Sequence, residues 1–176
     1  MVLENKKKFL STLNFCSVKK NVISPDKKLK KNNIKESVFR IIDANLNRCR
    51  EGLRVIEESL RFILDDKVFY KNIRSIRHSL DKILRNKYGE LIKKRNSFED
   101  LGRQILETAT KELSAVVIAN FKRVEESLRV LEEYSKAFAP ETSADFKKQR
   151  YLTYMIEKKI YIKYKKFFDK IIIENS

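Results

Sequence analysis

The chain carries one set of polar residues twice, 75 residues apart. Residues 44–62 read ANLNRCREGLRVIEESLRF, and residues 119–137 read ANFKRVEESLRVLEEYSKA. The matched polar pairs include Asn45 with Asn120, Arg48 with Arg123, and Glu51 with Glu126. An arginine can hold an anion, and an amide offers both a hydrogen-bond donor and an acceptor. A duplicated core needs only the leucines, so the duplicated polar set predicts two half-sites facing each other across a pseudo-twofold axis.

A helical wheel places these polar residues beside the predicted core. The apolar residues of the first copy form one stripe: Cys49, Leu53, Ile56 and Leu60. Asn45 lies on the edge of that stripe, and Arg48 shares the adjoining strip with Gly52. Ser127 takes the place of Gly52 in the second copy. A buried amide or guanidinium is costly without a partner, so these strips predict a concave polar patch that binds an anion.

The remaining charges of the repeat have a simpler interpretation. Oppositely charged residues recur at spacings of three and four, which stabilises exposed helices by a few tenths of a kcal/mol per pair. We expect such a solvated ladder to include Arg54, Glu58, Arg61, Arg129 and Glu133. Glu57 and Glu132 flank the other side of the apolar stripe, where the pattern favours neither a ladder nor a site.

Long helices must position these residues. Apolar residues at three- and four-residue steps predict a first helix from about Ile34 to Asp65, and a second that frays near Tyr88 and Gly89. A connection over 95–110 precedes a third helix from about Thr110, and a fourth follows Pro140. These elements predict an all-α bundle without a sheet, built from a helix pair used twice.

The composition of the chain limits the classes of partner and site that we expect. A net charge of +16 with lysines near both ends raises nucleic acid or an acidic membrane as a partner, whereas the three glycines are too scattered for a phosphate-binding loop. Two isolated cysteines and one histidine build neither a disulfide framework nor a metal cluster, which favours a reducing cytoplasm. No apolar run reaches the roughly 20 residues that span a bilayer. We expect a basic tail over 1–34 and a helical domain over 35–170.

Four stretches together resemble one particular helical domain. They are 42–58, Ile76-Arg77-His78, 119–136 and Gln149-Arg150-Tyr151. The chain is similar, over about residues 38–160, to an all-helical hydroxymethylpyrimidine phosphate kinase domain. That domain occurs alone or as the N-terminal extension of some bacterial thiamin-phosphate synthases. The resemblance implies ATP-dependent phosphorylation of hydroxymethylpyrimidine phosphate to the diphosphate, with Mg²⁺.

The resemblance and the repeat together suggest roles for individual residues. The predicted catalytic residues are Arg48, Arg123 and Asp100. The predicted substrate-binding residues are Asn45, Asn120, Glu51, Glu126 and Arg95. The predicted ATP-binding residues are Arg54, Arg129 and Gly102, and the predicted Mg²⁺ ligands are Asp100, Glu57 and Glu132.

The central segment departs from the family pattern Arg-Asp-x-x-x-Asp-x-Gly-Thr. Here Asn96 replaces the first aspartate and Arg103 replaces the threonine. The alternative is therefore a non-catalytic module that binds the pyrimidine phosphate or a partner such as thiamin-phosphate synthase. A basic nucleic-acid-binding protein ranks third, because the lysines concentrate outside the repeat and no DNA-binding helix motif is present. The repeat also allows a homodimer through the tyrosine-rich fourth helix.

Overall fold

The computed structural model describes residues 31–98, 100, 112–137 and 139–169, all within one compact unit, Lys31–Ser176. Most of the predicted tail lies outside the described residues, as do Gly102 and Arg103. Every regular element in the described ranges is a helix, which confirms the all-α class. None of these helices is both long and apolar enough to cross a membrane.

The first two long helices form a hairpin. Helix α2 spans Lys31–Phe62, and α3 spans Lys67–Ile83. Asp66 caps α3, because its Oδ1 accepts hydrogen bonds from the backbone N–H groups of Val68 and Phe69, both at 3.0 Å. The neighbouring Asp65 takes a left-handed φ of 45°, which an aspartate tolerates better than most residues. The turn chemistry at 65–66 thus ends one helix and starts the next.

The second hairpin consists of α5, Leu113–Ser135, and α6, Pro140–Lys163. Pro140 lies in the first turn of α6, where its missing N–H costs nothing. The third helix was predicted to begin near Thr110, which lies outside the described residues. Glu112 precedes α5 without a side-chain capping bond.

Short elements differ from the predicted fraying near Tyr88. A 3₁₀ turn, η1, spans Arg85–Lys87, and a further helix, α4, spans Tyr88–Lys94. A four-residue helix, α7, follows α6 at Lys165–Phe168. Leu91 is almost fully buried and packs α4 against the core. The apolar periodicity of the sequence did not predict this contact.

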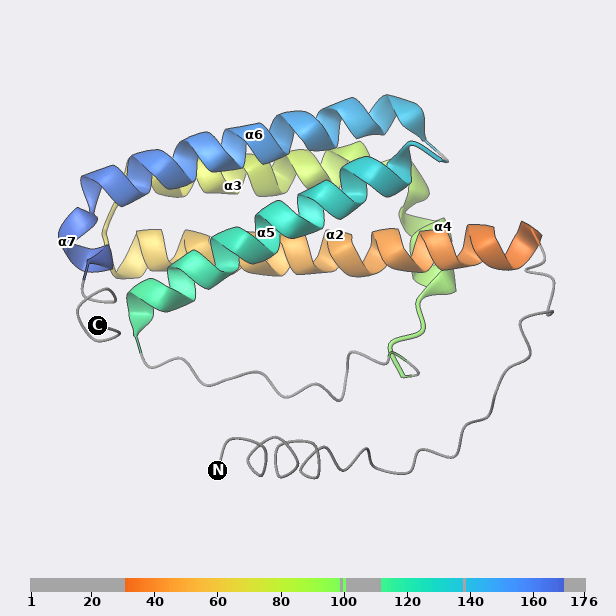
Figure 1. Cartoon of the computed structure of the whole chain (residues 1–176), viewed down its shortest axis with the longest axis horizontal. Helices are drawn as coiled ribbons and strands as arrows, with labels where there is room; N and C mark the ends of the chain where they lie inside the picture. Colours follow the sequence, from red (N-terminus) through yellow and green to blue (C-terminus); the bar gives the residue numbers. More distant parts are fainter. Residues whose placement is uncertain (1–30, 99, 101–111, 138, 170–176) are drawn as a thin grey trace, which may run out of the picture. The chain divides into compact units, whose positions relative to one another are not determined.

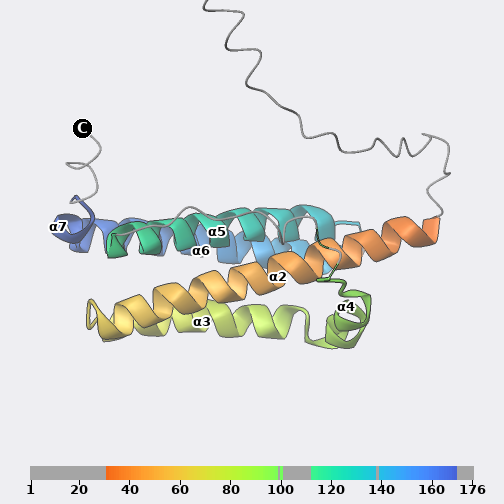
Figure 2. The same ribbon diagram turned by 90° about the horizontal axis from the view of Figure 1, so that it is seen from below.

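The two hairpins stack as two layers. Figure 1 shows α2 beside α3 and α5 beside α6, and Figure 2 shows α5 and α6 lying over α2 and α3. Helix α2 packs against α5, and α3 packs against α6. Asp66 also joins the two layers, since its Oδ2 accepts hydrogen bonds from Lys163 Nζ at 2.6 Å and the Tyr164 hydroxyl at 2.7 Å. Burial acts to raise the pKa of Asp66, but these bonds outweigh it and lower the pKa to about 2.

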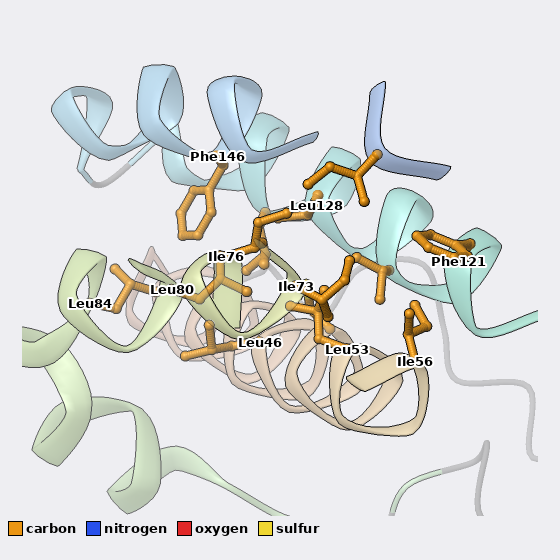
Figure 3. Close-up of a cluster of buried hydrophobic side chains, with 14 of the residues drawn as sticks. Leu46, Leu53, Ile56, Ile73, Ile76, Leu80, Leu84, Phe121, Leu128 and Phe146 are labelled. Atoms are coloured by element: carbon orange, nitrogen blue, oxygen red, sulfur yellow. The ribbon is translucent and has the colours of Figure 1, made fainter. Parts of the chain in front are cut away.

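The core lies between the layers, and all four long helices contribute to it (Figure 3). The stripe predicted from the first copy is fully buried: Cys49, Leu53, Ile56 and Leu60. Ile73 and Ile76 meet it from α3, and Phe121 and Leu128 meet it from α5. Burial raises the pKa of the Cys49 thiol, so this cysteine is a packing residue and not a nucleophile.

Gly52 lies where α2 passes close to α5. A Cβ atom at Gly52 would lie 2.8 Å from Val124 Cγ2 and 3.2 Å from the carbonyl oxygen of Asn120. Neither neighbour can yield easily, because Val124 is fully buried and the carbonyl belongs to the α5 backbone. Glycine here therefore permits a close helix crossing, although it weakens the helix itself by up to about 1 kcal/mol.

We predict opposite effects for alanine at two glycines. Gly52→Ala should lower the free energy of unfolding by about 1 kcal/mol, because overpacking costs more than improved helix propensity returns. The matched Gly89→Ala should raise it by up to about 1 kcal/mol, since a Cβ there meets nothing within 4 Å. Urea unfolding of both variants measures the difference. Equal stabilisation by both substitutions would contradict the close crossing.

Candidate functional site

A surface cavity of about 660 Å³ lies between α2 and the segment that follows α4. Its polar lining on α2 comprises Ser37, Arg40, Asp43, Asn45, Asn47, Arg48 and Glu51. The facing wall comprises Arg95, Asn96, Ser97 and Asp100. Three arginines, three carboxylates and three amides thus converge on a space large enough for a small phosphorylated ligand.

Asp43 and Arg95 fasten the two walls together. Arg95 Nε donates to Asp43 Oδ2 at 2.6 Å, and Arg95 Nη2 donates to Oδ1 at 2.7 Å. This bidentate bond to the carboxylate raises the pKa of Arg95. A weaker contact follows, in which Arg40 Nη2 donates to the Asn96 carbonyl oxygen at 3.5 Å. Outside the cavity, Lys94 and Glu36 form an exposed pair at 2.5 Å between the same elements.

The structure brings together five residues that the sequence singled out: Asn45, Arg48, Glu51, Arg95 and Asp100. Arg48 and Glu51 are exposed on one face of α2, whereas Asn45 is mostly buried beside the core as the wheel predicted. Asn45 Nδ2 donates one hydrogen bond to the Ile41 carbonyl at 2.8 Å. Its second N–H and its carbonyl oxygen remain for other partners.

The second copy does not complete this cavity. None of the described lining residues comes from α5. The predicted residues absent from the lining are Asn120, Arg123, Glu126, Arg54, Arg129, Glu57 and Glu132. Asn120 instead lies at the helix crossing, where its carbonyl faces Gly52. The two half-sites across a pseudo-twofold axis stay a prediction.

The repeat does reproduce local contacts. Asn120 Nδ2 donates to the Val116 carbonyl at 2.8 Å, as Asn45 does to Ile41. Arg54 pairs with Glu58 at 2.6 Å, and its counterpart Arg129 pairs with Glu133 at 2.9 Å. These i,i+4 pairs confirm the charge ladder for Arg54, Glu58, Arg129 and Glu133, whereas Arg61 lies over the ring of Phe62.

Glu57 and Glu132 occupy matched buried positions and accept from arginines of the partner helix. Arg77 on α3 donates from Nε to Glu57 Oε2 at 2.8 Å. On α6, Arg150 donates from Nη2 to Glu132 Oε2 at 2.7 Å. The bond to Glu57 raises the pKa of Arg77.

Each of these carboxylates also accepts from its own helix, Glu57 from Arg54 at 3.1 Å and Glu132 from Arg129 at 3.0 Å. Across the part of the chain that the structure describes, no group of three or more His, Cys, Asp or Glu side chains is arranged to hold a metal. The contacts therefore favour a structural role for both glutamates over the predicted Mg²⁺ role.

Sequence reasoning missed the N-terminal part of the α2 face. Arg40 and Asp43 precede the repeat, and Asn47 lies within it without a counterpart. Arg40 lies eight residues before Arg48 and about 80° around the helix from it, so extending the wheel would have placed Arg40 on the same side of the helix but beyond the strip of Arg48 and Gly52. Asp43 carried no such signal, because its partner Arg95 lies 52 residues away.

Comparison with known proteins matches the segment that builds this cavity. A family model described as the ThiD2 family matches residues 40–159. Thiamine-phosphate synthase of Nostoc punctiforme is 40% identical over 130 residues, which cover 72% of this chain and 36% of that protein. Thiamine-phosphate synthase of Rhodopirellula baltica is 37% identical over 132 residues, covering 72% and 35%. The chain thus spans about a third of the length of these relatives. No solved structure matches.

We predict that Glu132 contributes to stability and not to metal binding. Glu132→Gln should lower the free energy of unfolding by about 3 kcal/mol, because it leaves the buried Arg150 without its carboxylate. The neighbouring Glu133→Gln, in the exposed ladder, should cost less than about 1 kcal/mol. Urea unfolding with and without Mg²⁺ measures both effects. A wild-type stability that rises with Mg²⁺, and loses that rise in Glu132→Gln, would favour the metal role.

Proposed function

Because the chain belongs to the ThiD2 family, we propose that it acts in thiamin biosynthesis and phosphorylates hydroxymethylpyrimidine phosphate with ATP. The pathway is supported by relatives named thiamine-phosphate synthase. The choice of substrate and reaction rests on the resemblance of residues 38–160 to the helical kinase domain. The proposed location of the site rests on the cavity between α2 and the segment that begins at Arg95. Arginines, carboxylates and amides from the matched segment converge there.

The proposed reaction needs alignment more than acid–base catalysis. A phosphate oxygen of the pyrimidine phosphate forms a bond to the γ-phosphorus of ATP. The bond from that phosphorus to the bridging oxygen breaks, and ADP leaves with the electron pair. The attacking phosphate is already mostly dianionic near pH 7, because its second pKa is about 6. A catalyst of this reaction must therefore chiefly hold two anions in line and offset their repulsion.

The α2 face offers suitable groups for this task. Arg40 and Arg48 both line the cavity and lie eight residues apart, about 12 Å along the helix axis, so they can contact different phosphate groups. Asn45 and Asn47 lie between or beside them and can pair with the amino group and ring nitrogen of the pyrimidine. These residues would bind and orient the substrates.

The carboxylates of the cavity fit Mg²⁺ held jointly with phosphates. Glu51 and Asp100 both line it, and Mg²⁺ in phosphoryl-transfer sites is commonly bound by one or two carboxylates plus substrate oxygens. Bound there, Mg²⁺ would neutralise phosphate charge. Asp43 is unsuited to this role because Arg95 takes both its oxygens.

A non-catalytic binding module is the second candidate. The observation that favours it is the position of Asn96, which lines the cavity where the family pattern has an aspartate. An amide cannot supply the negative charge that a metal or a developing positive centre would use. This candidate keeps pyrimidine-phosphate binding and lacks ADP release.

We predict that the purified chain releases ADP from Mg·ATP only when hydroxymethylpyrimidine phosphate is present. Arg48→Ala should lower kcat/KM at least about 100-fold, because a cation that stabilises the transferring phosphate is lost. Arg50→Ala is the matched control two residues along α2, since Arg50 pairs with Asp81 at 3.0 Å outside the cavity lining. Arg50→Ala should change kcat/KM less than about threefold.

Two other outcomes would overturn the kinase. Wild-type turnover in Arg48→Ala would mean that the reaction does not take place in this cavity. A ligand-induced rise in melting temperature without ADP release would favour the binding module.

A further inference from the structure

We propose that Asp43 is a positioning residue for the ligand cavity, acting through Arg95 to hold the wall formed by Arg95, Asn96, Ser97 and Asp100 against α2. The inference rests on the proposed function, because it concerns the same cavity. It differs from the sequence-based expectation, in which Arg95 itself binds substrate and Asp43 has no role.

Burial makes this pair the firm contact between the walls. The Asp43 side chain is 7% exposed and that of Arg95 is 37% exposed, and both Asp43 oxygens accept from Arg95 at 2.6 and 2.7 Å. A carboxylate so buried is costly unless it is paired, so α2 and Arg95 are strongly coupled. The neighbouring Glu36–Lys94 pair joins the same elements but is about half exposed at both ends, where ion pairs contribute little.

Arg95 is the first residue of the cavity wall that faces α2, so its pairing with Asp43 affects the position of that wall. Arg95 is the C-cap of α4, and its φ of −60° and ψ of 129° start the extended segment. Asn96 and Ser97 follow directly, Asp100 lies three residues further on, and all three line the cavity opposite α2. Anchoring Arg95 to α2 therefore fixes where this wall begins. A shift of about 1 Å in such an arrangement can cost on the order of 100-fold in rate.

The pair also sets the charge of the cavity. Asp43 takes the Nε–H and one N–H of Nη2 of Arg95, so both N–H groups of Nη1 and the second N–H of Nη2 are left to donate to a ligand. Removing Arg95 would leave the buried Asp43 carboxylate facing an anionic ligand. Removing the Asp43 charge would free Arg95 to follow the ligand or solvent. Both changes should therefore weaken binding, and each should do so through the other residue.

A double-mutant cycle on the full chain tests this coupling. The variants are Asp43→Asn, Arg95→Gln and the double variant, with Glu36→Gln as the matched control on the exposed pair. Calorimetric titration with hydroxymethylpyrimidine phosphate gives Kd, and turnover with Mg·ATP gives KM and kcat. All measurements are made below the melting temperature of every variant. If Asp43→Asn fails to fold, Arg95→Lys replaces it, because lysine keeps the charge and loses the bidentate geometry.

We expect Asp43→Asn and Arg95→Gln each to raise Kd and KM at least about 10-fold, and the double variant to be within about twofold of the worse single variant. Glu36→Gln should stay within twofold of wild type. Additive effects, or an Asp43→Asn variant with wild-type Kd and KM, would overturn the positioning role.

Failure of the proposed reaction can be distinguished from failure of the positioning role of Asp43. If the wild type binds the pyrimidine phosphate without turnover, phosphoryl transfer fails while the Kd cycle still decides the role of Asp43. If the wild type does not bind it, both proposals fall.

Discussion

The close crossing of α2 and α5 is the constraint on which the rest of the structure depends. Gly52 lets the two helices meet with Val124 and the Asn120 backbone against α2, and the apolar stripe from Leu53 to Leu60 is buried as a consequence. Each hairpin is then fastened internally by a buried ion pair, Glu57 with Arg77 and Glu132 with Arg150. Replacing such a pair by apolar residues need not destabilise a fold, but breaking one side does. The duplicated glutamates thus each form an ion pair within their own hairpin.

The repeated polar residues are of two kinds. The glutamates and the ladder arginines contact each other in both copies, so their recurrence reflects structure. Asn45, Arg48 and Glu51 line a cavity, and their recurrence in α5 has no counterpart among the described lining residues. The asymmetry arises from α4 and residues 95–100, which cover α2 and supply the facing wall. A duplicated sequence therefore supports an unequal pair of surfaces, one of which lines a cavity.

Periodicity was sufficient for the helices and the core but not for the site as a whole. The long helices and the buried stripe follow from local spacing, which a single sequence displays directly. Helix α4 was missed because it is seven residues long and Gly89 interrupts its pattern. Asp43 was missed, and the ion pair of Glu57 was not foreseen, because their partner arginines lie 52 and 20 residues away. Local spacing carries no information about such contacts.

The central claim is that ligand binds between α2 and residues 95–100, and locating the ligand tests it most directly. The measurement is a crystal structure of the chain grown with saturating hydroxymethylpyrimidine phosphate. We predict that the phosphate group contacts Arg48 and that the ring lies beside Asn45 or Asn96, with the Asp43–Arg95 pair intact. Ligand bound against α5 near Arg123, with the α2 cavity unchanged, would contradict it.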